Sequence, residues 1–564
     1  MRSFARNLLA QTGAVLLLGW LAACSDTTTP TLSAPTGVTA VATSATSILV
    51  SWNQVSGATG YEVDRAEGAG AFSNVATGLT ATVYNDTGLQ PSTDYRYQVR
   101  TVEGTATSTS SSAASTTTPA VGAKEARVTG VTLNRTFYAD TLYILSGYVK
   151  VSNSATLTIQ AGTKIVGDTL VPGSSLWILR GSKIMAVGTV DAPIVFTSAR
   201  AAGSRAPGDW GGIIIVGKGL INRTANPIFT EGPVGAAENY AGGTDNNDNS
   251  GMLKYVRVEF AGYDVSNGGG QELNSVSSYA VGRGTQYDYV QSMAGLDDSF
   301  EFFGGAADVR HLVSFESGDD HFDWTEGYQG RAQYLIALQT SVLTPRPGTG
   351  TVSSDPRGFE GDGCEIDKAG CTFFNPPYSM PVWANFTVVG PGPGVFTPTD
   401  GNGAVVRRGG AVNFVNGIVA RWPGVGVSIR DTATRNLMNV DTLYVRNIIL
   451  AENGSNFEAP GTNYGSRLSD SASVWNITTS TLSALFTGAL PTGATAVTTA
   501  NLNLGLAAGA AARTGGLSSF AGTPIAARVQ NFFGAAMPAT SYIGAVDPSA
   551  GTQWFEGWTN WQRN

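Results

Sequence analysis

One pattern occurs twice in this chain at an offset of 22 residues, and this repeat limits the folds that the chain can adopt. The first copy is YVQSMAGLDDSFEFFGG (289–305) and the second is HLVSFESGDDHFDWTEG (311–327). A fixed period in the low twenties is typical of a solenoid, in which each repeat buries its apolar face only by stacking on the next. The leucine pattern of leucine-rich repeats is missing, and short alternating strands with glycine corners remain. We therefore predict a parallel β-helix.

Stacking of the two copies places equivalent residues above one another. Side chains alternate along a strand, so Phe300 and Phe302 are predicted to point inward, while Glu301 points outward above Asp323. Adjacent coils lie about 4.8 Å apart, so stacked carboxylates repel each other unless water or a cation separates them. Calcium binds oxygens at roughly 2.3–2.6 Å and could bridge two coils. We therefore predict a Ca²⁺ site with the candidate ligands Asp297, Asp298, Asp319, Asp320, Glu301 and Asp323.

Two other interpretations of the acidic motif stay open. Aspartates at the corners can simply cap turn amides. Alternatively, Glu301 and Asp323 could be the two carboxylates of a glycosidase, since neighbours about 5 Å apart suit a retaining mechanism. A lyase would also need a basic residue near the carboxylates, and Arg283 and Arg310 are available without a motif that fixes either one there.

His321 and His311 are the only histidines of the chain, and both fall inside the repeated motif. His321 replaces Ser299 in the column expected to face outward, between Asp319 and Asp323. Flanking carboxylates would favour its charged form, so it is either a proton donor or a surface histidine held by its neighbours.

Composition and charge narrow the classes of partner. Charged residues make up only 13% of the 564 residues and hydrophobic residues 42%, which argues against disorder. The net charge is −8, and residues 245–330 hold 15 acidic residues against 4 basic ones. Nucleic acid is therefore an unfavourable partner, because phosphates need a basic face. Cations and neutral polar ligands such as sugars remain open.

The N-terminus has the features of a targeting segment. Two arginines precede an apolar core at 8–18, and the following Leu-Ala-Ala-Cys resembles a bacterial lipobox ending at Cys24. Residues 1–23 are thus predicted to be a lipoprotein signal peptide and residues 24–33 a tether, with an ordinary cleaved signal as the alternative. Ser25 follows the cysteine, and the absence of aspartate there favours the outer membrane.

Lipidation of Cys24 would leave two cysteines, Cys364 and Cys371, seven residues apart in a turn-rich segment. An oxidising compartment permits a small disulfide loop there. A metal site made of two isolated cysteines is a weaker interpretation.

Residues 34–119 show the pattern of a seven-stranded β-sandwich. They resemble a fibronectin type III domain, with Trp52 as the core tryptophan and Leu89 and Tyr95 in the tyrosine-corner region. This resemblance implies a spacer or adhesive module without a catalytic role.

Residues 120–564 alternate between short strands and glycine-rich turns, and we assign them to the β-helix. Insertions are expected near 340–380 and 488–522. The tryptophan-rich end, YIGAVDPSAGTQWFEGWTNWQ (542–562), is predicted to shield the last coil, because open solenoid ends invite edge pairing.

Several segments of this region carry a family resemblance. The stretches GDWGGIIIVGKGLIN, GGTDNNDNSGMLKYVRVEFAGYD, the two Asp-Asp coils and WFEGWTNW are similar to those of bacterial surface lipoproteins with right-handed parallel β-helix domains. The resemblance implies an all-β fold and a surface location. Pectate lyases share this fold, but a fold alone does not confer their activity.

Together these features favour a lipid-anchored protein of the outer membrane that faces the cell surface. Its β-helix would be a binding or structural surface, with a polysaccharide as partner and Ca²⁺ at the acidic coils. A polysaccharide lyase or glycoside hydrolase that uses the stacked carboxylates is the alternative. A purely structural adhesion component is a third hypothesis.

Overall fold

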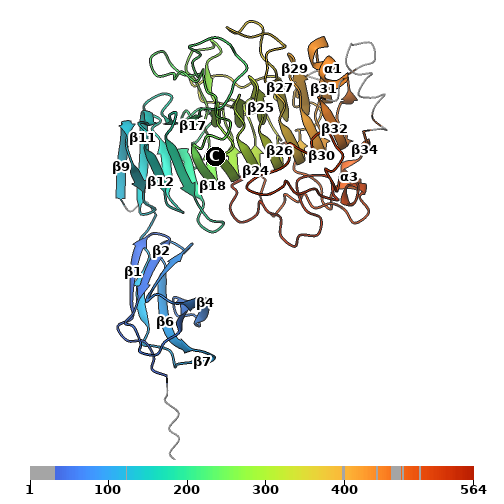
Figure 1. Ribbon diagram of the computed structural model, residues 1–564. Coiled ribbons are helices and arrows are strands. Elements are labelled where there is room, and N and C mark those ends of the chain that lie inside the picture. Colours follow the sequence, from blue (N-terminus) through green and yellow to red (C-terminus); the bar gives the residue numbers. More distant parts are fainter. Residues whose placement is uncertain are drawn as a thin grey trace, which may run out of the picture. The chain divides into compact units, whose positions relative to one another are not determined.

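The computed structural model describes residues 32–121, 124–396, 400–439, 442–458, 472, 475–493, 497–498 and 500–563. The predicted signal peptide and Cys24 lie outside the described residues. Within the described ranges, no helix has the length and apolar character needed to cross a bilayer. Figure 1 traces the elements in chain order.

The N-terminal domain consists of two sheets, as predicted for a fibronectin-like β-sandwich. Trp52 is buried and contacts the ring of Tyr61 edge-on at 5.4 Å. The hydroxyl of Tyr95 accepts a hydrogen bond from the amide of Gln90 at 2.9 Å, as a tyrosine corner requires. The first sheet contains β1 (Thr39–Ser44), β2 (Ser47–Ser51) and β5 (Val83–Thr87). The second contains β3 (Gly60–Glu67), β4 (Ser73–Leu79), β6 (Asp94–Glu103), β7 (Ala106–Thr107) and β8 (Ala114–Thr117).

The second domain is a parallel β-helix, as the repeat predicts. Its first strands are β9 (Lys124–Thr132), β10 (Arg135–Phe137), β11 (Thr141–Val151), β12 (Thr156–Ile159), β13 (Lys164–Gly167), β14 (Ser175–Ile178), β15 (Lys183–Val187), β16 (Ile194–Ser198), β17 (Ile213–Val216) and β18 (Gly251–Glu259). A separate antiparallel pair follows, β19 (Tyr263–Asp264) and β20 (Glu272–Leu273).

From there the strands alternate between two walls. One wall, here called the carboxylate wall, contains β21 (Val276–Tyr279), β23 (Phe300–Phe303), β25 (Phe322–Thr325), β27 (Phe359–Asp362), β29 (Ala404–Arg407), β31 (Val425–Ile429) and β33 (Ser455–Phe457). The other contains β22 (Gln286–Met293), β24 (Asp308–Phe315), β26 (Arg331–Leu338), β28 (Val382–Val389), β30 (Asn413–Ala420), β32 (Tyr444–Ala451) and β34 (Ile477–Ser480). The short helices are α1 (Thr432–Asn439), α3 (Leu482–Leu485) and the 3₁₀ turn η1 (Ala511–Arg513).

The register of the parallel strands confirms the 22-residue offset of the two repeated copies, whereas later coils are longer, as between Val382 and its partner Asn413. Phe300 pairs with Phe322 and Glu301 with Asp323, each 22 residues apart. Phe300 and Phe322 are fully buried, and their rings stack at 5.7 Å. Apolar rings therefore fill the interior of the coils, as the alternation of the sequence predicts.

A column of residues at one corner of the β-helix adopts left-handed backbone conformations with φ between 49° and 62°. Its first part is aromatic: the rings of Tyr255, Tyr289 and His311 stack at 4.4 Å and 4.2 Å. Asparagine, which tolerates this conformation well, takes over in the later coils. We call this column the corner ladder; its members are Tyr255, Tyr289, His311, Tyr334, Asn385, Asn416, Asn447 and Asn476.

The tryptophan-rich C-terminal segment does not shield the last coil, so that prediction is wrong. The segment runs back along the domain, and the C-terminus lies near β18 and β24 (Figure 1). Trp558 contacts the rings of Tyr255 and Tyr289 edge-on at 5.8 Å and 6.0 Å. Trp558 therefore packs against the aromatic part of the corner ladder and not against the last coil.

Candidate functional site

The carboxylate wall places acidic side chains from three consecutive coils in one column. Parallel pairing sets Glu301 of β23 beside Asp323 of β25, and Asp323 beside Glu360 of β27. Each acidic residue directly follows an inward-facing phenylalanine, so alternation turns all three away from the core. Glu360 extends the predicted pair to a column of three.

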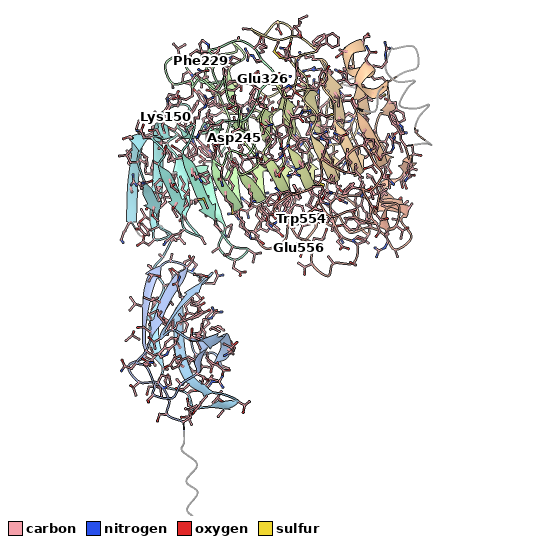
Figure 2. All side chains as sticks on the ribbon, viewed as in Figure 1. Lys150, Phe229, Asp245, Glu326, Trp554 and Glu556 are labelled. Carbon is pink, nitrogen blue, oxygen red and sulfur yellow. A yellow bond between two sulfur atoms is a disulfide. The ribbon has the colours of Figure 1, made fainter. Side chains whose placement is uncertain are left out.

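This column lines a cavity of about 290 Å³, here called the acidic cavity. Aromatic rings stand beside the carboxylates: those of Tyr279 and Phe303 stack at 4.1 Å with an angle of 7° between their planes. Phe229 and Glu326 lie on one side of the domain and Trp554 on the other (Figure 2). The lining residues are Arg223, Phe229, Glu231, Tyr240, Gln271, Tyr279, Glu301, Phe303, Asp323, Thr325, Glu326, Glu360, Asp362, Glu365 and Lys368.

The carboxylate column is not the open surface that the sequence pattern indicates. Glu301 and Asp323 are only 8% and 9% exposed, because side chains from distant loops close over them. Phe229 comes from the loop before β18, and Lys368 from the loop after β27. The outer face of the strands is therefore the floor of an enclosed polar site.

Burial changes the acidity of this column. It raises the pKa of Glu301 well above its usual range, and the nearby charges of Glu231 and Asp323 raise it further. Burial likewise raises the pKa of Asp323, with Glu360 as its strongest charged neighbour. Burial raises the pKa of Glu231 to about 8. Burial and the neighbouring negative charges therefore disfavour the charged form of each of these carboxyl groups unless a cation compensates their charge.

The geometry of the carboxylates suits a cation. Carboxylate oxygens of Asp298, Glu301 and Asp323 lie within 4.8 Å of one another, and so do those of Asp297, Asp298 and Asp319. One buried oxygen of Asp323 and one of Asp319 have no hydrogen-bond partner. A donor set made only of oxygens is the type that Ca²⁺ prefers. These residues therefore fit a calcium ion.

Asp320 differs from the other candidate ligands, because it has protein partners for both oxygens. It accepts hydrogen bonds from the amide of Arg357 at 2.6 Å and from the Arg357 guanidinium at 3.2 Å. Asp298 also binds the backbone, since its Oδ1 accepts a hydrogen bond from the amide of Asp320 at 2.8 Å. Asp320 belongs to neither oxygen cluster among the described residues, and its contacts are those of a turn cap.

Comparison with known proteins places this architecture in a family. Residues 129–494 match the pectate-lyase-like β-helix domain. The chain belongs to this family. Residues 33–118 match the fibronectin type III domain, which confirms that resemblance as well.

Individual relatives cover only small parts of the chain. A poly(3-hydroxybutyrate) depolymerase from Ralstonia pickettii is 44% identical over 82 residues, 14% of this chain, and the match spans only 16% of that enzyme. A fibronectin-III-like protein from Clostridium thermocellum is 34% identical and covers 15% of this chain and 93% of its own, with a TM-score of 0.15. The FN5 domain of Drosophila Lar is 29% identical and covers 15% of this chain and 94% of its own, with a TM-score of 0.14.

His321 does not belong to the outward column, so its predicted position is wrong. It lies at the corner before β25, where strand alternation does not yet apply, and it is fully buried. Its Nδ1 is 2.6 Å from Oγ of Ser314. Burial lowers the pKa of His321 to about 3. The residue is therefore neutral at physiological pH and is not a proton donor.

The basic residues considered from the sequence also lie elsewhere. Arg310 pairs with Asp288 at 2.8 Å, and Arg283 lines a different cavity. Arg223 and Lys368 supply the positive charge in the acidic cavity instead.

Several site residues were missed by the sequence interpretation. Glu231 and Tyr240 come from a long loop whose fold depends on tertiary contacts, so no local pattern marks them. Glu360 could have been found from the sequence, because the pair Phe359-Glu360 repeats Phe300-Glu301 and Phe322-Asp323. The extra residues after β26 interrupt the 22-residue period and hide this repeat.

Cys364 and Cys371 form a disulfide with an S–S distance of 1.95 Å. The loop that they close carries Glu365 and Lys368, both of which line the acidic cavity. The disulfide therefore fixes the loop after β27, which forms one edge of the acidic cavity.

Proposed function

We propose that this chain is a lipid-anchored surface protein whose β-helix binds carbohydrate in the acidic cavity, with Ca²⁺ held by Asp298, Glu301 and Asp323. One observation carries the proposal: buried carboxylate oxygens from successive coils converge within 4.8 Å beside stacked aromatic rings. Asp297 and Asp319 extend the oxygen cluster along the next corner.

The need for charge compensation supports the cation. Burying several carboxylates together is unfavourable unless they are protonated or paired with positive charge. Asp323 keeps one buried oxygen without a partner, and a calcium ion would occupy that position. When bound, the ion would neutralise the column and present open coordination positions to ligand oxygens.

The remaining lining supports a sugar as ligand. Ligand sites combine apolar and aromatic walls with a few placed polar groups. Phe229 is 58% exposed at the rim, so its ring face is available for a sugar ring. Arg223 and Gln271 add hydrogen-bond donors for hydroxyl or carboxylate oxygens.

Calorimetric titration with Ca²⁺ tests the cation site. We expect saturable binding by the wild-type protein, and affinity weakened by about tenfold or more in Glu301→Gln and in Asp323→Asn, since each loses one charged ligand. Glu125→Gln, an exposed residue of β9, is the matched control and should bind as the wild type does. Absence of binding by the wild-type protein contradicts the cation site.

Hydrolysis or elimination of a polysaccharide is the second candidate function. The raised pKa of Glu301 favours it, because a raised pKa suits a carboxyl group to act as a general acid. A panel of purified glycans, analysed for binding and for chain cleavage, separates the two functions. Cleavage that is lost in Glu301→Gln identifies an enzyme; binding without cleavage supports the binding function. If none of the glycans binds saturably, the result supports the purely structural hypothesis.

The membrane anchor is tested separately. Cys24→Ala should move the protein from the membrane fraction to the soluble fraction, because the lipid acceptor is lost. Surface exposure is then measured by protease accessibility on whole cells. A wild-type protein in the soluble fraction contradicts the anchor but leaves the cavity's function open.

A further inference from the structure

A second cavity of about 240 Å³ has the opposite charge. It lies between the start of β26 and a C-terminal stretch around residue 528. Three guanidinium groups and four side-chain amides surround it, and no acidic residue lines it among the described residues. We call it the arginine cavity; its lining is Asn247, Arg283, Gln329, Arg331, Ala527, Arg528, Gln530 and Asn531.

The positive charge of this cavity is only partly compensated. Arg331 pairs with Asp308, with 2.9 Å between Nε and Oδ1, and both residues are buried. In the described part of the chain, neither Arg283 nor Arg528 has a carboxylate within 4.0 Å. Two guanidinium charges therefore remain beside one that is already paired.

The contacts of Arg528 show what is missing. Its Nη2 donates to the carbonyl of Met380, whereas its Nη1 is buried and has no acceptor. Burial, together with the charges of Arg283 and Arg331, lowers the pKa of Arg528 to about 10. A buried guanidinium N–H without an acceptor is unfavourable, and a negatively charged oxygen nearby would relieve both the repulsion and the burial.

The backbone holds these groups in place. The Arg331 guanidinium donates to the carbonyl of Arg528 at 3.0 Å and to that of Asn531 at 2.9 Å. Arg283 donates to the carbonyl of Gln329 at 3.3 Å. The arginines are thus fixed by neutral carbonyls before any ligand arrives, so little side-chain freedom is lost on binding.

We propose that the arginine cavity binds an oxyanion: a phosphate, sulfate or carboxylate group. Guanidinium forks match the paired oxygens of such groups, and the surrounding amides add neutral donors. The chain carries a net charge of −8, so nonspecific attraction of anions is weak and a local site is required. The oxyanion comes either from a free inorganic salt or from an acidic group of a polysaccharide.

Calorimetry on the full chain with sodium phosphate, sodium sulfate and galacturonate, each at constant ionic strength, tests this site. We expect saturable binding of at least one of the three, weakened by about tenfold or more in the double variant Arg283→Gln/Arg528→Gln. Arg135→Gln, an exposed arginine of β10, removes an equal charge elsewhere and should leave binding unchanged. Preference for phosphate or sulfate indicates an inorganic ligand, and preference for galacturonate indicates an acidic sugar.

Two outcomes overturn the proposal. One is the absence of saturable binding of all three anions to the wild-type protein, which needs no variant. The other is unchanged affinity in a double variant whose circular dichroism matches that of the wild type. Arg528→Lys keeps the charge but loses the planar fork, so we expect intermediate affinity if the guanidinium geometry recognises the anion.

Discussion

At the corner before β25, His321 is enclosed by Ser314 and by the ring of Trp422 at 6.0 Å. Its Nε2 is buried without a hydrogen-bond partner. Protonation would place an uncompensated charge in the interior, which explains why burial lowers its pKa to about 3. Burial also raises the pKa of Glu301 at its separate position in the acidic cavity, because burial disfavours the charged form of an acid as it does that of a base.

The buried histidine predicts a dependence of stability on acid pH. In the unfolded chain a histidine binds its proton near pH 6.5, whereas folded His321 binds it only near pH 3. Its stabilising contribution is complete above pH 6.5 and is lost as the pH falls, by about 1.4 kcal/mol per pH unit. We expect His321→Gln to lose less stability than the wild type between pH 7 and pH 4.5. Urea unfolding at both pH values measures this, and equal losses in the two proteins contradict it.

At the scale of elements, the corner ladder joins the C-terminal segment to the coils. The side-chain amide of Asn385 donates to Oγ1 of Thr540 at 2.7 Å and to the carbonyl of Gly544 at 3.2 Å. Asn447 donates to the carbonyl of Gly515 at 2.7 Å. The side-chain amides of these left-handed asparagines therefore supply donors for carbonyl and hydroxyl oxygens of the C-terminal segment.

Removing a buried member of the ladder should loosen the C-terminal segment. Asn385→Ala deletes these hydrogen bonds and also places alanine in a left-handed conformation, so we expect a loss of about 2–4 kcal/mol. Asn476→Ala is the matched comparison, because Asn476 is exposed and makes one longer bond, of 3.4 Å, to Gly515. Urea unfolding and limited proteolysis of the C-terminal segment measure the difference. Equal effects of the two substitutions contradict the role of the buried contacts.

The loop after β27 depends on its disulfide. Cys364 and Cys371 are seven residues apart, and cross-linking such a short loop raises the free energy of unfolding by about 2 kcal/mol. In Cys364→Ser/Cys371→Ser we expect this loss of stability together with weaker Ca²⁺ binding, because Glu365 and Lys368 lose their fixed positions at the cavity. Unfolding and calorimetry measure the two effects. Unchanged stability contradicts the structural contribution of the disulfide.

At the scale of the molecule, local pattern predicts the coils but not what covers them. The 22-residue period and the alternation of Phe300 and Glu301 suffice to predict the fold and the stacking of carboxylates. The loop residues Glu231 and Lys368 follow no period, since their positions depend on contacts with coils far away in the sequence. The prediction that the tryptophan-rich end shields the last coil is wrong for the same reason, because the partner of Trp558, Tyr255, lies about 300 residues earlier in the sequence.

Calcium should stabilise one domain and not the other. A ligand that binds only the folded state adds about 2.7 kcal/mol of stability at 100 times its dissociation constant. The oxygen clusters at Glu301 and Asp319 belong to the β-helix alone, so calcium should raise the melting temperature of that domain and leave the fibronectin type III transition in place. Scanning calorimetry of the full chain with calcium and then with excess chelator measures both transitions. The Glu301→Gln variant should show little calcium-dependent shift of the melting temperature. An equal shift in the variant and the wild type, or a shift of both transitions, would mean that calcium acts somewhere other than at the stacked carboxylates.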